Sequence, residues 1–95
     1  MPRASKKLSK IDDKPANIIQ YLESIGFNLK SREMLQHRHT NYIIQNVAKK
    51  NEKNKYAKIW QIFKYSNQEK IIYFEHKQLS NLKNYIQDNL LLELL

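Results

Sequence analysis

Three histidines and one glutamate next to a histidine have the side-chain types and the close spacing that could bind a metal ion. His37 and His39 are separated by one residue, and Glu75 and His76 are adjacent later in the chain. Side chains two positions apart do not share a face of a helix, so the first pair could bind one ion only from an extended segment. We interpret this pair as adventitious and predict no metal site. The histidines then contribute weak positive charge beside Arg38.

No arrangement of residues typical of an enzyme stands out. The chain contains no cysteine, which excludes a thiolate nucleophile, and its single glycine excludes the Gly-rich loops that bind phosphates. Asp12 and Asp13 lie at an expected helix start, where the helix dipole is sufficient to explain two acids. We therefore predict a protein with no catalytic residues and no cofactor.

The distribution of basic residues is the strongest chemical signal. Lysine and arginine outnumber aspartate and glutamate by 17 to 9, and five lysines with one glutamate place a charge of +4 within residues 49–58. Each lysine that neutralises a phosphate releases condensed counterions, so this cluster favours binding to nucleic acid over an uncharged ligand. The predicted phosphate contacts are Arg3, Lys6, Lys7, Arg38, Lys49, Lys50, Lys53, Lys55 and Lys58.

Polar and aromatic residues near the lysine cluster are candidates for contacts with bases. Asn and Gln can form paired hydrogen bonds with adenine, and exposed aromatic rings can stack on unpaired bases. There are competing explanations for both groups: codon bias can enrich Asn, and a small domain needs aromatic rings for its core. The predicted base contacts are Asn41, Tyr42, Gln45, Tyr56 and Trp60.

Leucine makes up five of the last six residues of the chain. On a helix these side chains cover most of the circumference, so one small domain surface cannot bury them all. Either this end packs deeply into the core, or it meets a second copy and adds buried apolar area. We favour a homodimer that uses Leu90, Leu91, Leu94 and Leu95. The acidic residues at this end make binding to a membrane surface a poorer fit.

Length and composition predict one compact domain over residues 13–95, preceded by a basic flexible tail over residues 1–12. No apolar run approaches the roughly 18 residues that span a bilayer, and the basic start is not followed by the apolar segment of a secretory signal. The lack of cysteine also fits a reducing compartment. We expect a cytoplasmic or nucleoid-associated protein that is not secreted.

Local patterns predict five elements that must position these residues. Pro15 and Gly26 bound a helix over residues 15–25, Ser31 caps a short helix, and the apolar spacing of residues 40–50 favours a third helix. Residues 56–65 and 71–74 are rich in β-formers and flank a polar turn, which indicates a hairpin. A last helix begins near Ser80.

The order helix, short helix, helix, hairpin, helix resembles a winged helix–turn–helix domain. That resemblance implies an α+β fold in which the third helix enters a DNA groove and the hairpin forms the wing. If residues 40–50 are instead a strand, the second half of the chain becomes a three-stranded antiparallel sheet followed by a helix. That alternative is similar in pattern to the single-strand-binding platforms of the Pur-alpha type.

Three functions follow from these interpretations. The first is a non-enzymatic nucleic-acid-binding protein, a small dimeric transcription regulator that binds duplex DNA in preference to RNA. The second is a binder of single-stranded DNA or RNA that uses an aromatic sheet face. The third is a small inhibitor or adaptor protein that docks on an acidic protein partner.

Overall fold

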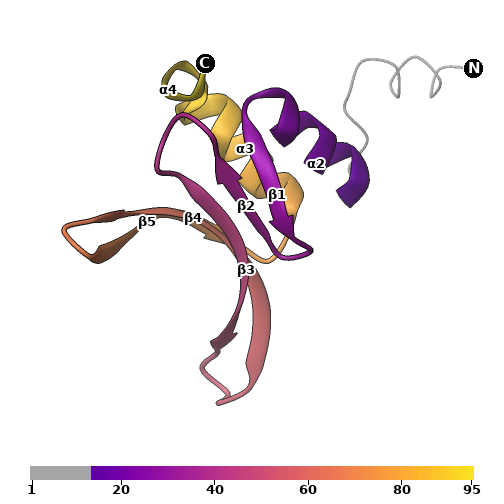
Figure 1. The fold of residues 1–95 in the computed structure, drawn as a ribbon. Coiled ribbons are helices and arrows are strands. Elements are labelled where there is room, and N and C mark those ends of the chain that lie inside the picture. Colours follow the sequence, from indigo (N-terminus) through magenta and orange to yellow (C-terminus); the bar gives the residue numbers. More distant parts are fainter. Residues whose placement is uncertain (1–13) are drawn as a thin grey trace, which may run out of the picture.

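A computed structural model describes residues 14–95 as one helix, five consecutive strands and two further helices. The strands follow one another in sequence order from one edge of the sheet to the other, without a crossover (Figure 1). The elements are α2 (Pro15–Ser24), β1 (Phe27–Ser31), β2 (Met34–His37), β3 (Ile43–Lys50), β4 (Tyr56–Ser66), β5 (Glu69–His76), α3 (Leu79–Asn89) and α4 (Leu91–Leu94).

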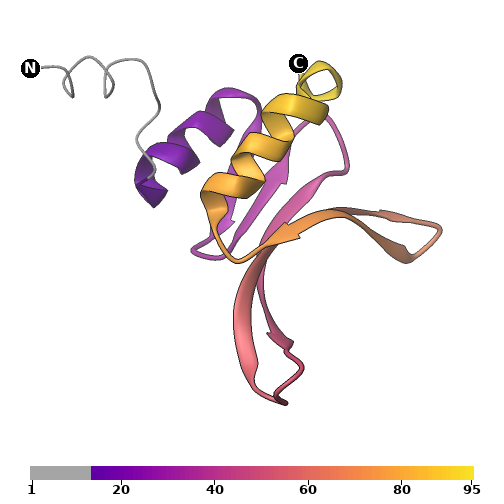
Figure 2. The same cartoon turned by 180° about the vertical axis from the view of Figure 1, so that it is seen from behind.

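The strands form a single antiparallel sheet in the order β1-β2-β3-β4-β5. Figure 2 shows α2 and α3 side by side against one face of this sheet. Side chains alternate between the two faces of a strand, so only every second residue can reach the helices. The opposite face carries no helix within residues 14–95.

The core lies between the helices and the covered face of the sheet. Leu35, Ile44 and Ile62 are neighbours across β2, β3 and β4, and all three are fully buried. Helices α2 and α3 contribute their own apolar stripes at helical spacing. The buried cluster consists of Ile18, Leu22, Ile25, Phe27, Leu35, Tyr42, Ile44, Ile62, Leu79, Leu82, Ile86, Leu90 and Leu94.

The junction between α2 and β1 depends on Gly26 and His37. Gly26 has a φ of +109°, and a Cβ atom at this position would lie 2.4 Å from Nε2 of His37. The buried His37 ring donates from Nε2 to the Ile25 carbonyl at 2.8 Å, while its Nδ1 accepts from the backbone N–H groups of His39 and Thr40. Both ring nitrogens are therefore used in holding the fold, and neither is free for a metal ion.

The expected winged helix–turn–helix arrangement is wrong. Residues 31–37, where a short helix was predicted, contain strand β2, and residues 43–50 form strand β3 instead of a recognition helix. The apolar residues Ile43, Ile44 and Val47 fit a helical stripe, but they also fit a strand that carries apolar groups on both faces. Their β-branched side chains and the pairing with β2 and β4 favour the strand.

The first helix, the hairpin and the last long helix lie where the sequence places them, as α2, β4–β5 and α3. The alternative interpretation, in which three antiparallel strands precede a helix, describes β3, β4, β5 and α3 correctly. It misses β1 and β2, so the sheet is larger than either interpretation predicts. The fold is α+β, with an N-terminal helix, a five-stranded antiparallel sheet and C-terminal helices.

Strand β4 is unusually long and connects two hairpins that leave the helical layer in different directions (Figure 1). Residues 56–63 of β4 pair with β3, and residues 60–66 pair with β5. The pairing with β5 shifts in register between Ile62 and Phe63, where Tyr73 of β5 has no paired residue. The extra residue is in β5, and a bulge of this kind bends the strand and increases the local twist, so the β4–β5 hairpin turns away from the β3–β4 hairpin. The two hairpins carry different side chains.

Candidate nucleic-acid interface

The outer part of the β3–β4 hairpin, residues 48–58, is here called the lysine arm. Every residue in it is exposed, and it extends beyond the reach of both long helices (Figures 1 and 2). Its five lysines lie within ten residues of the sequence, and the two paired strands bring them onto one narrow ribbon. The structure therefore gathers Lys49, Lys50, Lys53, Lys55 and Lys58 as the sequence suggests.

The tip of the lysine arm is ordered by Asn51. Its Oδ1 accepts the backbone N–H of Lys53 at 2.9 Å and that of Lys55 at 3.1 Å, and its own N–H donates to the Lys55 carbonyl at 2.8 Å. Asn54 donates to the Asn51 carbonyl and has a φ of 66°, a conformation that Asn tolerates better than most residues. The turn is thus closed by backbone and Asn51 contacts, and the lysine side chains are not used to hold it.

Two of the five lysines are paired with acids at the base of the arm. Lys49 Nζ lies 2.6 Å from Glu75 Oε2, and Lys58 forms an ion pair with Glu33 in the β1–β2 turn. Within residues 14–95, Lys50, Lys53 and Lys55 have no acidic partner. The base of the arm is therefore fastened to the sheet, and three positive charges at its end are available to an anion.

The Lys49–Glu75 pair belongs to a short polar network on the uncovered face of the sheet. Gln61 donates from Nε2 to Glu75 Oε1 at 2.9 Å, and Lys70 donates from Nζ to Gln61 Oε1 at 2.8 Å. The hydrogen bonds from Lys49 and Gln61 lower the pKa of Glu75 below its ordinary value. The network connects β3, β4 and β5 and explains how Gln61 is buried without a helix above it.

Among the aromatic candidates, only Tyr56 presents its ring to solvent on the lysine arm. Its side chain is 71% exposed, and the Lys50 ammonium lies 5.6 Å from the ring centre. Trp60 is half-buried against the core, where it lines a surface pocket of about 440 Å³. A single exposed ring on this hairpin is too little for a stacking platform.

Tyr42 is a core residue in the structure. It is 2% exposed, and its hydroxyl donates to Glu93 Oε2 at 2.6 Å. Burial and this hydrogen bond raise the pKa of Tyr42 well above its ordinary value. The ring therefore joins the loop before β3 to the C-terminal end of the chain, and it is not available for stacking on a base.

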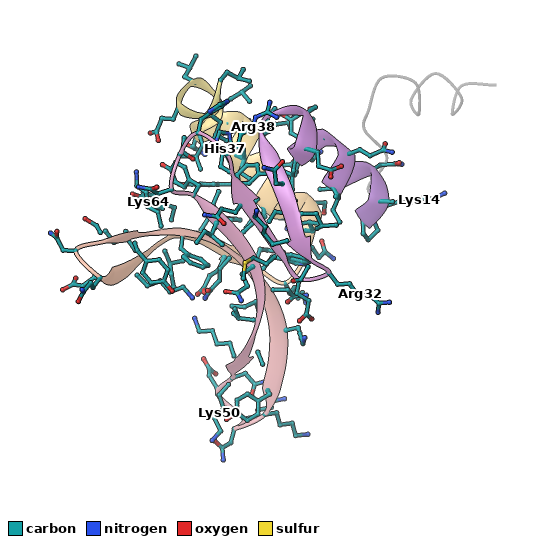
Figure 3. All side chains as sticks on the ribbon, in the orientation of Figure 1. Lys14, Arg32, His37, Arg38, Lys50 and Lys64 are labelled. Carbon is teal, nitrogen blue, oxygen red and sulfur yellow. The ribbon has the colours of Figure 1, made fainter. Side chains whose placement is uncertain are left out.

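The remaining candidates lie away from the lysine arm. Figure 3 places Arg38 near the C-terminal helices and Lys50 at the far end of the molecule. Asn41 is exposed in the loop before β3, and Gln45 is partly buried on the uncovered face. Arg3, Lys6 and Lys7 lie outside the described residues.

The outer part of the β4–β5 hairpin, residues 63–72, is here called the apolar arm. Its two lysines are directed at aromatic rings: Lys70 Nζ lies 4.1 Å from the centre of the Phe63 ring, and Lys64 Nζ lies 4.7 Å from that of Tyr42. Phe63 is 2% exposed although no helix covers it. Lysine stems and ring contacts cover apolar surface here, so this arm offers little free positive charge.

The C-terminal leucines divide between core and surface. Leu90 and Leu94 are buried in the protein's own core, and Leu91 packs partly against it. Leu95 is largely exposed, and Leu92 is 96% exposed. Two of the four leucines predicted to form a dimer interface are thus already used within the chain.

Sequence reasoning missed Asn51, Glu33 and Glu75 as parts of this site. The polar run at residues 51–55 signals a turn, so the role of Asn51 had a local signal. The two acids are 25 and 26 residues from the lysines they pair with, and nothing local connects them. Their partners are set only by strand register.

The chain matches no model of a protein family, and neither a curated protein nor a solved structure is significantly similar to it. None of the helices in residues 14–95 has the length and apolar character needed to cross a membrane. Within the same residues, no three His, Asp or Glu side chains gather where they could hold a metal ion.

Proposed function

We propose that the protein binds nucleic acid without catalysing a reaction, and that the lysine arm is its main contact with a duplex. The observation that supports this most strongly is the ordered, fully exposed hairpin whose end carries three lysines that have no acidic partner among residues 14–95. Such an arrangement is costly for a protein alone, because like charges repel, and it becomes favourable beside an anion. A small DNA-binding regulator acting in the cytoplasm or on the nucleoid is the corresponding role.

The dimensions of a two-stranded ribbon suit a groove of a duplex. The major groove of B-DNA is about 12 Å wide and accepts an α-helix or a two-stranded β-ribbon. In that position Lys50, Lys53 and Lys55 reach phosphates on the groove walls, and Tyr56 lies against sugars or base edges. The ion pairs of Lys49 and Lys58 keep the ribbon rigid, which reduces the entropy lost on binding.

Duplex binding is favoured over the single-strand alternative by the exposure of the rings. A platform for unpaired bases needs several exposed aromatic side chains on one surface. Phe63 is buried, Trp60 is half-buried, and Tyr56 and Tyr65 lie on different arms. Contact with the phosphate backbone of a duplex needs exposed positive charges, and the lysine arm exposes these.

Fluorescence anisotropy with labelled oligonucleotides tests the proposal. Duplex DNA, duplex RNA and single-stranded DNA of about two helical turns are compared at about 50 and about 200 mM salt. The test variant combines Lys50→Ala, Lys53→Ala and Lys55→Ala. The matched control combines Lys30→Ala, Arg38→Ala and Lys77→Ala, which removes the same charge from exposed positions outside the arm.

We expect duplex DNA to bind most tightly, and the arm variant to lose roughly tenfold or more in affinity at the lower salt concentration because three phosphate contacts are gone. The control should lose much less. Equal losses in the two variants would place the contact elsewhere and overturn the role of the arm. Absence of binding to every oligonucleotide at the lower salt concentration would overturn the proposal and leave an acidic protein partner as the interpretation to test.

A further inference from the structure

Strand β5 forms one edge of the sheet, and its outer side has no partner strand within residues 14–95. An unpaired edge exposes a row of backbone N–H and C=O groups that can pair with another strand. The turn between β4 and β5 determines which residues of β5 offer these groups.

The β4–β5 turn sets the hydrogen-bonding pattern. Asn67 and Gln68 have φ values of 52° and 70°, as in a two-residue type I′ turn, so Ser66 and Glu69 form a hydrogen-bonded pair. Antiparallel pairs alternate between bonded and non-bonded positions. Ile71 is therefore bonded to Lys64, whereas Lys70 and Ile72 direct their N–H and C=O groups away from β4.

The side chains of this edge leave it accessible. Residues 69–72 are all exposed, and Ile71 and Ile72 are 40% and 43% exposed on opposite faces of the strand. Natural edges are commonly protected by a proline, a projecting lysine or a bulge. Residues 69–72 include no proline, and their one lysine, Lys70, is turned inward onto Gln61 and Phe63.

The opposite edge of the sheet is protected. Strand β1 has five residues, its pairing with β2 is interrupted by an irregularity between Leu29 and Ser31, and Lys30 is exposed on it. Both a shift in register and a charged side chain discourage pairing with another strand. The register shift in β5 lies beyond Ile72, so residues 69–72 have neither form of protection and remain accessible.

We infer that β5 pairs with β5 of a second copy of this chain, antiparallel and about a twofold axis that passes through Ile71. In this register Lys70 lies opposite Ile72 of the second copy, and the outward groups of both residues form backbone hydrogen bonds. The two five-stranded sheets then become one continuous sheet. Isologous contacts of this kind close on themselves and form dimers.

Two competing registers fit the side chains less well. A twofold axis at Lys70 would place two lysines directly opposite each other, which is unfavourable for like charges. An axis at Ile72 would place Lys70 opposite Phe74, beyond the irregular pairing around Tyr73, where the alternation of β5 is broken. The axis at Ile71 avoids both problems and brings two exposed isoleucines into contact.

Single substitutions distinguish this dimer from one formed by the C-terminal leucines. Ile71→Lys places two like charges across the axis, and Leu92→Lys makes the same chemical change at the fully exposed leucine of the terminal segment. Sedimentation equilibrium of the full chain gives the mass, and circular dichroism confirms that each variant is folded. We expect a dimer for the wild type and for Leu92→Lys, and a monomer for Ile71→Lys.

A cysteine cross-link reports the register itself, since the natural chain contains no cysteine. The two copies of residue 71 form a non-hydrogen-bonded pair with Cα atoms about 4.5 Å apart, within the range that a disulfide bridges. Under mild oxidation Ile71→Cys should form a covalent dimer, whereas Leu92→Cys should remain largely uncross-linked. A monomeric wild type, a dimer lost only in Leu92→Lys, or preferential cross-linking of Leu92→Cys would each overturn the inference.

Discussion

The lysine arm and the apolar arm share strand β4, yet the same kind of residue has opposite roles in them. On the lysine arm, Lys50, Lys53 and Lys55 project from a ribbon in which every side chain is exposed. On the apolar arm, Lys64 and Lys70 lie over the rings of Tyr42 and Phe63. The number of lysines therefore does not locate a binding surface. A lysine is available to a ligand only where no aromatic ring or acidic side chain of the protein already contacts its ammonium group.

The difference also concerns how each arm keeps its shape. The apolar arm contains a buried ring, so it is stabilised partly by removal of apolar surface from water. The lysine arm has no buried side chain and depends on strand pairing, the Asn51 turn and two ion pairs at its base. Because the lysine arm has no buried side chains, substitutions in it should change the free energy of unfolding little. Such tolerance suits a surface that binds a partner.

The largest expected contrast is in truncation of one aromatic ring on each arm. Phe63→Ala should lower the free energy of unfolding by about 3–5 kcal/mol, because it removes a ring that is 2% exposed. Tyr56→Ala should change it by about 0.5 kcal/mol or less, because that ring is exposed. Urea unfolding measures both. Similar losses in the two variants would mean that the arms are stabilised in the same way.

The turns at the two tips give a smaller contrast. Gln68 has a φ of 70°, which is unfavourable for a residue with a Cβ atom, whereas Asn54 at 66° is a residue that tolerates this region. Gln68→Gly should therefore stabilise the protein by about 1 kcal/mol, and Asn54→Gly by no more than a few tenths. Thermal unfolding of both variants measures the difference. A destabilised Gln68→Gly protein would contradict the assigned turn.

The smallest expected effect concerns pH and the Lys49–Glu75 ion pair, which joins the base of the lysine arm to strand β5. The folded pKa of Glu75 lies below the unfolded value of about 4.5, so its contribution to stability is present above about pH 4.5 and is lost as pH falls through the lowered pKa. The pair is partly exposed, so the contribution is below about 1 kcal/mol.

The variant Glu75→Gln tests this assignment by unfolding in urea at several pH values. It should show a shallower loss of stability below pH 4.5 than the wild type, because no carboxylate remains to be protonated. Glu52→Gln, at the exposed tip of the lysine arm, serves as the control and should follow the wild type. Equal loss of stability at low pH in the wild type and in Glu75→Gln would show that the Lys49–Glu75 pair does not stabilise the fold.

Local signals were sufficient for some elements and not for others. Pro15 and Gly26 bound α2 in sequence as they do in space, and two β-rich runs around a polar turn identify β4 and β5. Residues 43–50 were ambiguous because a strand with apolar groups on both faces can match a helical stripe. The deciding contacts with β2 and β4 are distant in sequence, so no local pattern could supply them.

The same limit separates the predicted site residues. The five lysines were found because they are neighbours in sequence, and a hairpin keeps such neighbours together. The exposure of Tyr56 and the burial of Tyr42 depend on which face of the sheet the helices cover, and that is not visible in the order of residues. The same holds for the C-terminal leucines: Leu94 is buried in the core and Leu92 is exposed, and the sequence alone does not distinguish them.

The salt dependence of duplex binding tests the role of the lysine arm most directly. The logarithm of the binding constant is plotted against the logarithm of salt concentration for the wild type and for the variant lacking Lys50, Lys53 and Lys55. Each lost phosphate contact reduces the slope by about 0.9, so the variant should be flatter by roughly 2 to 3. Parallel lines for the two proteins would show that these lysines do not contact phosphates, and would contradict the account.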